Sequence, residues 1–331
     1  MMRGARAIWL FSFTSLLVVL LAASAACAAE AKPSVKVFLL VGQSNMQGKG
    51  SVEQLGQLVK SDPARFGRLQ KDGKWVERDN VFVVYPQFTE GGKDDLNGKL
   101  TVGFGWPPRE RFGPELGFGN VVGDAIHGPV LLIKCAWGGQ SLDVDFRPPS
   151  SGWDKPFDPN NREQWKPGTK GWAYQQIFNN VHATLDDLGK SVPELKGRSY
   201  DIAGLVWFQG WNDLIDPKRV SAYEGNLVHF IRDVRLHLNK PRLPIVIGVM
   251  GQDGDKPSPP MQRMRQAQEA PARMDEFRGS VVAVPTAPYW DPTVHYDGGY
   301  HYNGSARFFY DAGEAFGNAM LKLLDQQQAE K

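Results

Sequence analysis

Short apolar runs that alternate with helix-like stretches are the feature that most constrains how this chain folds. Most of these runs are apolar almost throughout, rather than at every second position, and they are rich in Val, Ile, Leu and Phe. Strands of this kind are buried on both faces, as in a parallel sheet that helices cover on two sides. The runs are Val35–Gly42, Asn80–Tyr85, Pro129–Ala136, Ile202–Gln209, Pro244–Met250 and Ser280–Pro285.

The stretches between the runs have the spacing of amphipathic helices. They are Glu115–His127, Ala173–Leu188, Pro217–Leu238, Pro260–Glu276 and Gly304–Leu324. This alternation predicts the α/β class, as a three-layer α/β/α sandwich with a mostly parallel central sheet. No linker, repeat or low-complexity tract divides the chain, so we expect a single domain over residues 30–331. Residues 49–111 and 141–171 are rich in Gly, Pro, Asp and Trp, and we expect them to be loop insertions that shape the site.

The first residues have the layout of a secretory signal peptide. Arg3 and Arg6 precede an apolar run over residues 8–22, and small residues follow up to Ala29. The apolar run is short for the roughly 20 residues that a membrane span needs. We therefore expect residues 1–29 to be removed, leaving a secreted or periplasmic protein with no stable membrane association. We do not expect a lipoprotein anchor at Cys27, because Ser24 stands where such sites carry an aliphatic residue.

Charge and cysteine content exclude several kinds of function. The formal net charge is +2, and it becomes zero without residues 1–29, which hold two Arg and no acidic residue. We therefore expect neither a nucleic-acid partner nor an anionic membrane, and a neutral substrate fits better. Only Cys135 remains in the mature chain, so no intrachain disulfide and no cysteine-based metal site can form. Cys135 lies in an apolar run, which favours a buried filler over a nucleophile.

The chemistry of the chain begins where the first apolar run ends. Leu39-Leu40-Val41 leads directly into Gly42-Gln43-Ser44-Asn45-Met46. A serine at a strand-to-helix turn can expose its hydroxyl, and a backbone amide there can point at an oxyanion. The alternative is an ordinary turn or helix cap.

Two further stretches carry polar groups at predicted strand or loop ends. Gln209 and Asn212 follow another buried strand, and the side-chain amide of either could donate to an oxyanion. They could equally form a polar turn that caps the next helix. Residues 294–304 place His295 and His301 beside Asp297, just before the last helix.

Taken together, these motifs resemble the SGNH-hydrolase superfamily, whose fold is flavodoxin-like. The likeness is greatest to the sialate O-acetylesterase domain and to carbohydrate esterase family six, the acetylxylan esterases. It spans about residues 35–320. Two other segments fit: Phe112-Gly113-Pro114-Glu115-Leu116 is similar to the block that supplies an oxyanion glycine, and Trp137-Gly138-Gly139-Gln140-Ser141 follows a strand.

The resemblance implies a role for each motif residue. Ser44 is the nucleophile, His301 the general base and Asp297 the acid that orients it. The oxyanion hole takes the amides of Ser44 and Gly113 and the side-chain amide of Gln209 or Asn212. No metal or organic cofactor is implied. Substrate contacts are expected from Gln43, Asn45, Trp137, Gly139 and Trp211.

The chain departs from the family pattern in two places. Trp211 stands where the family often has glutamate, and Gly298 stands at the usual position of the acid, three residues before the histidine. Asp297 is four residues before His301.

These observations predict a carboxylic ester hydrolase that is exported and removes O-acetyl groups from a carbohydrate, such as acetylated xylan or sialic acid. The predicted mechanism is a Ser-His-Asp acyl-enzyme mechanism. One alternative is a broad short-chain carboxylesterase or lipase that acts on non-sugar esters, and another is a non-catalytic carbohydrate-binding relative. Flat aromatic rings suit sugar faces, although any one of them can instead pack a loop. Six tryptophans fall in or beside the predicted loops: Trp106, Trp137, Trp153, Trp165, Trp172 and Trp211.

Overall fold

The computed structural model describes residue 1 and residues 32–86, 96–153, 156–158, 168–298 and 300–330. The chain divides into two compact units, Met1–Pro33 and Ser34–Lys331, and the description below concerns the second. Almost all of the predicted signal peptide, with Cys27, lies outside the described residues, as does Trp165.

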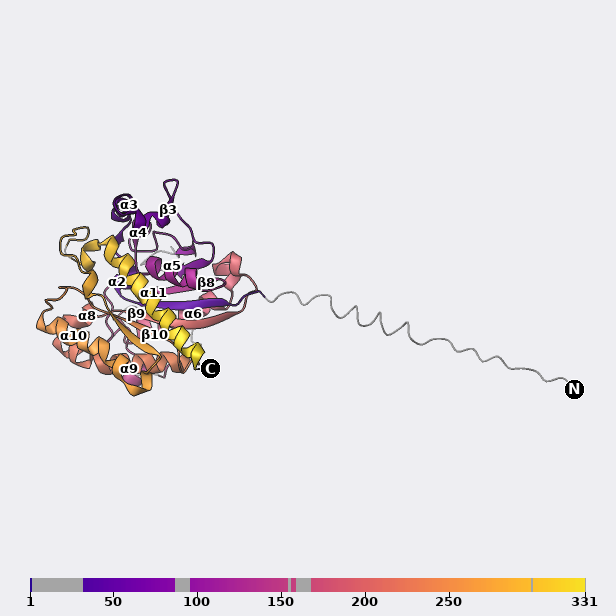
Figure 1. The fold of residues 1–331 in the computed structure, drawn as a ribbon. Helices are drawn as coiled ribbons and strands as arrows, with labels where there is room; N and C mark the ends of the chain where they lie inside the picture. Colours follow the sequence, from indigo (N-terminus) through magenta and orange to yellow (C-terminus); the bar gives the residue numbers. More distant parts are fainter. Residues whose placement is uncertain (2–31, 87–95, 154–155, 159–167, 299, 331) are drawn as a thin grey trace. The chain divides into compact units, whose positions relative to one another are not determined.

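A seven-stranded sheet forms the centre of this unit (Figure 1). Its strands lie in the order β11-β10-β9-β1-β8-β5-β6, and all neighbours run parallel except β5 and β6. All six predicted strands are present, with bounds that differ by at most two residues. The strands are β1 (Val35–Gly42), β5 (Val81–Tyr85), β6 (Leu96–Lys99), β8 (Val130–Ala136), β9 (Tyr200–Phe208), β10 (Ile245–Val249) and β11 (Val281–Pro285).

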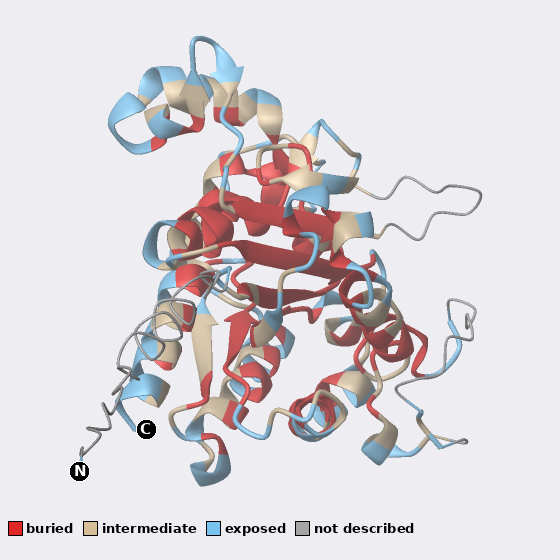
Figure 2. Cartoon of the chain, turned by 90° about the vertical axis from the view of Figure 1, so that its right-hand side faces the viewer, coloured by how far each residue is buried: buried red, intermediate tan, exposed pale blue. Residues whose placement is uncertain are grey.

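Helices cover both faces of the sheet, which confirms the predicted three-layer sandwich. Side chains of β1 alternate between two apolar clusters: Val37 and Leu39 contribute to one, and Phe38 and Leu40 to the other. The first cluster includes residues of α6 (Trp172–Leu185), α9 (Pro217–His237) and α10 (Pro259–Glu269). The second includes residues of α5 (Glu115–Ala125) and α11 (Ala306–Ala329), the yellow helix that crosses the strands in Figure 1. The strands between these layers are mostly buried (Figure 2).

Cys135 is fully buried on β8, as predicted for a core filler. Burial raises the pKa of its thiol to about 12, so the thiol stays protonated and unreactive.

The prediction that residues 49–111 form an irregular insertion is wrong in part. The ten-residue helix α3 (Val52–Ser61) lies there, and the Ser51 hydroxyl caps it by accepting a hydrogen bond from the Gln54 amide at 3.1 Å. β6 also lies there, as the antiparallel edge of the main sheet. The Gly and Pro content of the whole stretch indicated loops, so the sequence did not predict α3 or β6. Besides the predicted strand β5, the other elements of the stretch are α4 (Pro63–Phe66), a 3-10 turn (Gly67–Leu69) and the short strands β2 (Gly50–Ser51), β3 (Gln70–Lys71), β4 (Lys74–Trp75) and β7 (Arg111–Phe112).

The predicted helix over Pro260–Glu276 is shorter than expected. α10 ends at Glu269, and 3-10 turns follow at Ala270–Arg273 and Asp275–Phe277. Pro271 explains the end of the helix, because proline has no amide to donate and restricts the residue before it. Short elements elsewhere are α2 (Ser44–Gln47), α7 (Leu188–Ser191), α8 (Trp211–Leu214) and 3-10 turns at Pro149–Ser151, Pro193–Leu195, Ala287–Tyr289 and His301–Gly304. Within the described residues, no helix combines the length and the apolar character needed to cross a bilayer.

Candidate active site

Three neighbouring strands end together at the carboxyl edge of the sheet. Gly42 of β1 is in register with Ala136 of β8 and with Phe208 of β9. The residues that follow these three ends therefore meet at one place, and Ser44 is among them. Glycine is required at position 42, because a Cβ atom there would lie 2.1 Å from the Phe208 carbonyl oxygen. The chain can thus turn sharply into α2, and Ser44 is its first residue.

Gln43 joins the first of these turns to the turn that follows β9. Its side-chain oxygen accepts hydrogen bonds from the Gly210 amide at 3.1 Å, the Asn212 amide at 3.3 Å and Gln209 Nε2 at 3.2 Å. The side chain is buried. The structure therefore gives Gln43 the role of holding two turns together, in place of the predicted contact with substrate.

Asp297 and His301 form a close pair. His301 Nδ1 lies 2.5 Å from Asp297 Oδ2, and both side chains are about one-third exposed. The Tyr300 amide donates to the Asp297 carbonyl oxygen at 2.9 Å, which closes a turn, and Gly298 in this turn has φ +55°. The turn accommodates the extra residue, so the unusual spacing does not separate the carboxylate from the imidazole.

His301 begins a run of left-handed backbone. The φ angles are +48° at His301, +55° at Tyr302, +57° at Asn303 and +70° at Gly304. Positive φ is uncommon outside glycine, and surrounding contacts must hold such a run in place. The Tyr302 ring stacks on Phe308 with centroids 3.5 Å apart, and the Tyr302 hydroxyl accepts from the Gly251 amide at 3.0 Å.

Burial lowers the pKa of His301 below its ordinary value of 6.5. Asp297 opposes this shift through its hydrogen bond and its charge, whereas the nearby cations Lys49 and Arg111 add to it. The imidazole is therefore neutral at neutral pH, which is the form that a general base requires.

Ser44 and His301 face the same small cavity, whose volume is about 30 Å³. Its lining comes from the turn after β1, from α8, from the loop after β10 and from residues 290–302. The lining residues are Ser44, Asn45, Trp211, Gln252, Trp290, Tyr300, His301 and Tyr302.

The predicted oxyanion role of Gly113 does not fit the structure. The Gly113 amide already donates to Glu115 Oε1 at 2.7 Å. The other carboxylate oxygen of Glu115 accepts from Lys134 Nζ at 2.7 Å, and both of these charged side chains are fully buried. The Gly113 amide is thus part of a buried charge network.

Gln209 is also committed to a buried network. Its Nε2 donates to Asp213 Oδ2 at 2.6 Å, and its side-chain oxygen accepts from the Tyr223 hydroxyl at 2.9 Å. Asp213 further accepts from the amides of Leu142 and Asp143, and burial raises the pKa of its carboxyl to about 6. Gln209 is therefore not the side-chain donor of an oxyanion hole in this structure.

Asn212 lies nearer the surface than Gln209. Its side-chain amide donates to the carbonyl oxygen of Gly139. Of the two predicted side-chain donors, Asn212 is therefore the one placed at the rim of the site, and predicted Gly139 lies beside it.

Gly138 is a site residue that the sequence did not identify. A Cβ atom at Gly138 would lie 3.9 Å from Ser44 Cβ and 2.9 Å from Gln47 Oε1, so its backbone runs beside the nucleophile. The position is exposed. The pair Gly138-Gly139, directly after a buried strand, was the available signal, but only the order of the strands places β8 next to β1.

The chain matches the model of the carbohydrate esterase, sialic acid-specific acetylesterase family over residues 34–298. It belongs to this family. The predicted membership of the sialate O-acetylesterase group is thereby confirmed, and with it the prediction of a carboxylic ester hydrolase.

The chain is similar, at low sequence identity, to carbohydrate esterases of other organisms. A probable carbohydrate esterase of Arabidopsis thaliana is 22% identical over 228 residues, which cover 65% of this chain and 68% of that protein. Its solved structure has a TM-score of 0.54 at 17% identity and covers 87% of this chain and 98% of its own. A carbohydrate acetylesterase from Xanthomonas citri has a TM-score of 0.52 at 15% identity, over 86% of this chain and 55% of that one. These likenesses confirm the fold of the esterase family.

Aromatic side chains near the esterase site fall into two groups. Trp137 is buried against Trp172, with ring centroids 5.2 Å apart, so it packs the core and does not make its predicted contact with substrate. Trp153 packs on Phe157. Among the predicted tryptophans that the structure describes, Trp211 is the one that lines the cavity, and it is 36% exposed. Trp290, which the sequence analysis did not single out, lines the cavity as well.

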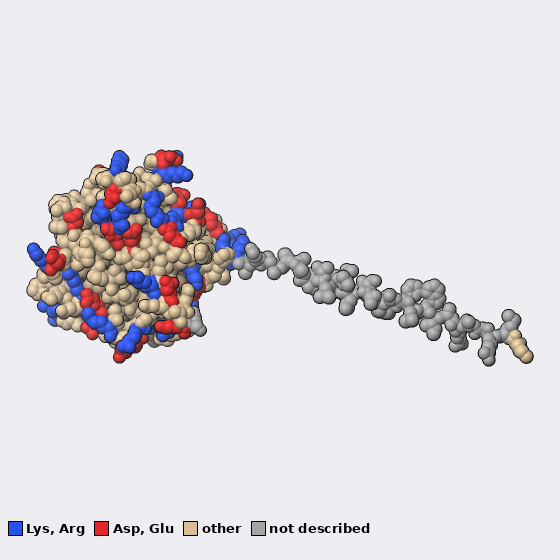
Figure 3. Space-filling model, in the orientation of Figure 1, with Lys and Arg blue, Asp and Glu red and all other residues tan. Residues whose placement is uncertain are grey.

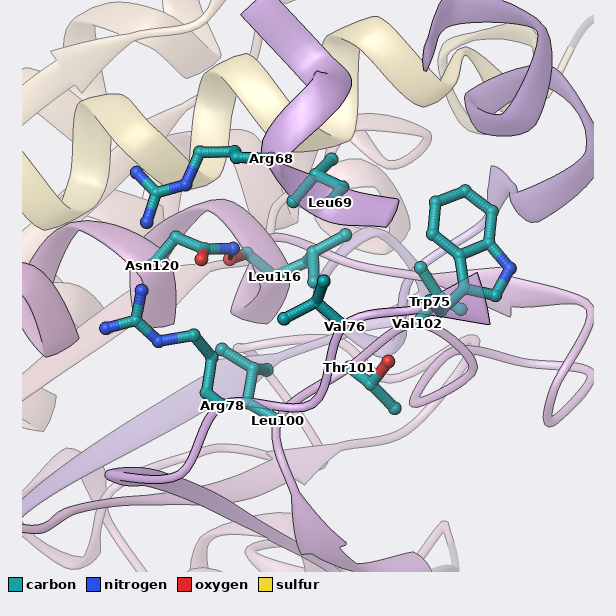
Figure 4. Close-up of a pocket in the computed structure, with 10 residues that line it drawn as sticks. All are labelled: Arg68, Leu69, Trp75, Val76, Arg78, Leu100, Thr101, Val102, Leu116 and Asn120. Carbon is teal, nitrogen blue, oxygen red and sulfur yellow. Dashed lines mark hydrogen bonds between the residues drawn. The ribbon is translucent and has the colours of Figure 1, made fainter. Parts of the chain in front are cut away.

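A second cavity, of about 40 Å³, lies apart from the esterase residues (Figure 4). It is lined by Arg68, Arg78, Asn120 and apolar side chains that include Trp75 and Leu116. Its two arginines both bind Asp124, at 2.8 Å and 2.6 Å. Both arginines are thus already paired with a carboxylate of the protein. None of the predicted site residues lines this cavity.

Proposed function

We propose that this protein is an exported serine esterase that removes O-acetyl groups from a carbohydrate. The observation that carries the proposal is the Asp297–His301 pair facing the same cavity as Ser44. Membership of the carbohydrate esterase family supports the reaction class and the kind of substrate.

In the proposed mechanism, His301 takes the proton of the Ser44 hydroxyl while the serine oxygen attacks the acetyl carbonyl carbon. Asp297 holds the imidazole through Nδ1 and stabilises the imidazolium that forms. The tetrahedral intermediate collapses, the sugar oxygen leaves, and it takes the proton from His301. A water molecule, activated by the same histidine, then attacks the acyl-enzyme and releases acetate.

We assign the hydrogen-bond donors of the oxyanion hole to the backbone amides of Ser44 and Gly138, with the side chain of Asn212 as a third donor at the rim of the site. Gly138 replaces Gly113 in this assignment because its backbone runs beside Ser44, whereas the Gly113 amide is bonded to Glu115. Donors aimed at the developing charge lower the barrier of acyl transfer.

The size of the cavity supports acetyl as the acyl group. The cavity volume of about 30 Å³ exceeds the roughly 10–15 Å³ of cavity space that a single water molecule needs. A short acyl group such as acetyl therefore fits beside Ser44 better than a long acyl chain. We expect acetyl nitrophenyl esters to be cleaved much faster than butyryl or octanoyl esters. A preference for octanoyl esters would favour the lipase alternative.

A second screen tests whether the alcohol part of the ester substrate is a carbohydrate. Purified protein is incubated with acetylated xylan and with O-acetylated sialic acid, and released acetate is measured with Ser44→Ala as the control. The exposed face of Trp211, beside the nucleophile, supports binding of a sugar ring. Absence of hydrolysis with all of these esters would indicate the non-catalytic relative.

Export is the last part of the proposal. The basic residues, apolar run and small residues within positions 1–29 support a cleaved signal peptide and a mature domain over residues 30–331. Protein recovered from the periplasm or medium of a bacterial host should begin near Glu30, as N-terminal sequencing would reveal. Recovery of the full-length chain from the cytoplasm alone would contradict export.

A further inference from the structure

Two buried amide side chains beside the nucleophile have an unused hydrogen-bond acceptor. Asn45 Oδ1 and Gln252 Oε1 are both inaccessible to solvent, and neither has a hydrogen-bond partner in the part of the chain that the structure describes. Both residues line the cavity that Ser44 and His301 face, and they are 5% and 7% exposed. A buried polar atom without a partner is destabilising, so a pair of them in one cavity calls for an explanation.

The backbone at Gln252 is held firmly, although the side-chain oxygen is not bonded. Gln252 lies in the loop that follows β10, and its carbonyl oxygen accepts from Arg265 Nη2 at 2.7 Å. Arg265 Nη1 binds the Gly254 carbonyl oxygen at 2.8 Å. On the other side of Gln252, the Gly251 amide donates to the hydroxyl of Tyr302, the neighbour of His301. These bonds fix the place of Gln252 relative to the proposed catalytic histidine.

The chemistry of an acetyl ester limits what these oxygens can bind. An amide oxygen accepts hydrogen bonds, so its ligand must carry an O–H or N–H group. The acetyl group and the ester oxygen have no such donor. Among the groups of the substrate, the donor must therefore belong to the alcohol part, close to the esterified oxygen.

We infer that Gln252 and Asn45 form a subsite that accepts hydrogen bonds from hydroxyl groups next to the acetylated position of a sugar. This inference rests on the proposed function and adds a criterion for substrate choice. Esters that retain a free neighbouring hydroxyl are preferred over esters that lack one. Gln252 thus determines specificity and takes no part in proton transfer.

The test compares substrates that differ only in this hydroxyl. The probes are a monoacetylated methyl xyloside and an O-acetylated sialic acid, each with an analogue in which hydrogen replaces the hydroxyl next to the ester. We expect the wild-type protein to hydrolyse the hydroxyl-bearing form of at least one pair with a kcat/KM roughly 10- to 100-fold higher than that of its analogue. In Gln252→Met, which keeps the length of the side chain but removes the acceptor, this ratio should approach one.

Nitrophenyl acetate, which has no neighbouring hydroxyl, separates specificity from general damage. The loss of kcat/KM that Gln252→Met causes should be larger for the hydroxyl-bearing sugar esters than for nitrophenyl acetate, because the lost acceptor has no partner on that substrate. Gln176→Met is the matched control: Gln176 is equally buried, on α6, and it does not line the cavity. This control should leave the ratio unchanged.

The outcomes distinguish the inference from the proposed function. Equal rates for both members of each pair in the wild-type protein, or an unchanged ratio in Gln252→Met, would overturn the inference and leave the esterase proposal intact. The comparison of substrates in the wild-type protein tests the inference even if Gln252→Met does not fold. Hydrolysis of nitrophenyl acetate without any release of acetate from the sugars would overturn both the subsite and the carbohydrate substrate. Unchanged turnover of nitrophenyl acetate in Ser44→Ala would overturn the proposed nucleophile.

Discussion

At the scale of single residues, the proposed reaction depends on three side chains that act together. Asp297 touches His301, and His301 shares a cavity with Ser44. Because each member acts through its neighbour, loss of any one should disable the group without disturbing the surrounding core.

Replacement of Ser44 or His301 by alanine should lower ester turnover by roughly 10⁴-fold or more. Both variants should keep the circular dichroism spectrum of the wild-type protein. His295→Ala is the matched control, since His295 is exposed in the same segment. If His295→Ala loses activity and His301→Ala keeps it, the assignment of the base is wrong.

The pH profile should carry the signature of a buried histidine. Activity requires the neutral imidazole, and burial lowers the pKa of His301. The acid limb of kcat/KM should therefore lie below pH 6.5, the ordinary value for histidine.

The pH dependence of kcat/KM in Asp297→Asn tests whether Asp297 is the partner of His301. The substitution removes the interactions that raise the pKa of His301, so the acid limb should move to still lower pH. Turnover at neutral pH should fall by up to about 10⁴-fold, because the imidazole is no longer held in the required tautomer. An acid limb that moves upward in this variant would rule out Asp297 as the partner.

Gln209 and Asn212 should behave differently on substitution, although the sequence places both at the same turn. Gln209→Leu removes one buried hydrogen-bond partner from Asp213 and one from Tyr223, and it should lower the free energy of unfolding by roughly 1–3 kcal/mol. Asn212→Ala should leave stability nearly unchanged and reduce kcat by about 10²- to 10³-fold, as expected for an oxyanion donor. Denaturant unfolding and steady-state kinetics on both variants separate the two roles. A loss confined to KM in Asn212→Ala would remove it from the oxyanion hole.

At the scale of elements, one buried ion pair connects the turn that carries Ser44 to the rest of the sandwich. Lys134 on β8 donates to Glu115 on α5 and to the carbonyl oxygens of Gln47 and Phe104, each at 2.7 Å. The pair therefore fixes the end of α2.

Lys134→Met should destabilise the protein strongly. It leaves the Glu115 carboxylate buried without its cation, which costs about 3–5 kcal/mol in comparable cases. Lys36→Met is the control, because Lys36 pairs with Asp201 at a partly exposed site and should cost about 1 kcal/mol or less. Urea unfolding of both variants tests the difference. The double variant Lys134→Met, Glu115→Gln should be less destabilised than Lys134→Met alone, and additive losses would contradict the coupling.

Elements with a strong local signal could be predicted from the sequence, whereas those that depend on neighbours could not. Each continuous apolar run became a strand, because the runs are short, rich in β-branched residues and buried on both faces of a parallel sheet. β6 has the sequence Leu-Asn-Gly-Lys, and only its pairing with β5 makes it a strand. In the same way, the motifs predict Ser44, Asp297 and His301 as site residues, but our choice of Gly138 over Gly113 depends on which glycine lies beside Ser44 in space.

At the scale of the whole molecule, charge is balanced and finely mixed. On the face shown in Figure 3, Lys and Arg are interspersed with Asp and Glu. Exposed charged side chains also form ion pairs, such as Arg65 with Asp311, Arg232 with Glu276 and Arg242 with Glu330. Without residues 1–29 the formal net charge is zero. Such a surface has no extended field that would attract a polyanion.

The mature protein should therefore bind neither heparin nor vesicles of anionic lipid at about 0.15 M salt, where surface charges are screened beyond about 8 Å. Cosedimentation with vesicles and retention on heparin are the measurements. As a control, a variant with several exposed Glu residues changed to Lys should be retained on heparin. This result would show that the assay responds to charge. Firm retention of the wild-type protein on heparin or vesicles would contradict this expectation.

The left-handed run at residues 301–304 also limits which sequences can encode this site. Its four residues are His, Tyr, Asn and Gly, and only the last two adopt this backbone readily. Saturation mutagenesis should accept Gly or Asp at position 303 and reject Val, Ile and Thr throughout the run, whatever chemistry those side chains bring. The positions that follow the proposed catalytic histidine therefore tolerate few residue types. Their backbone conformation limits which residues can be substituted there, just as catalysis limits which residue can stand at position 301.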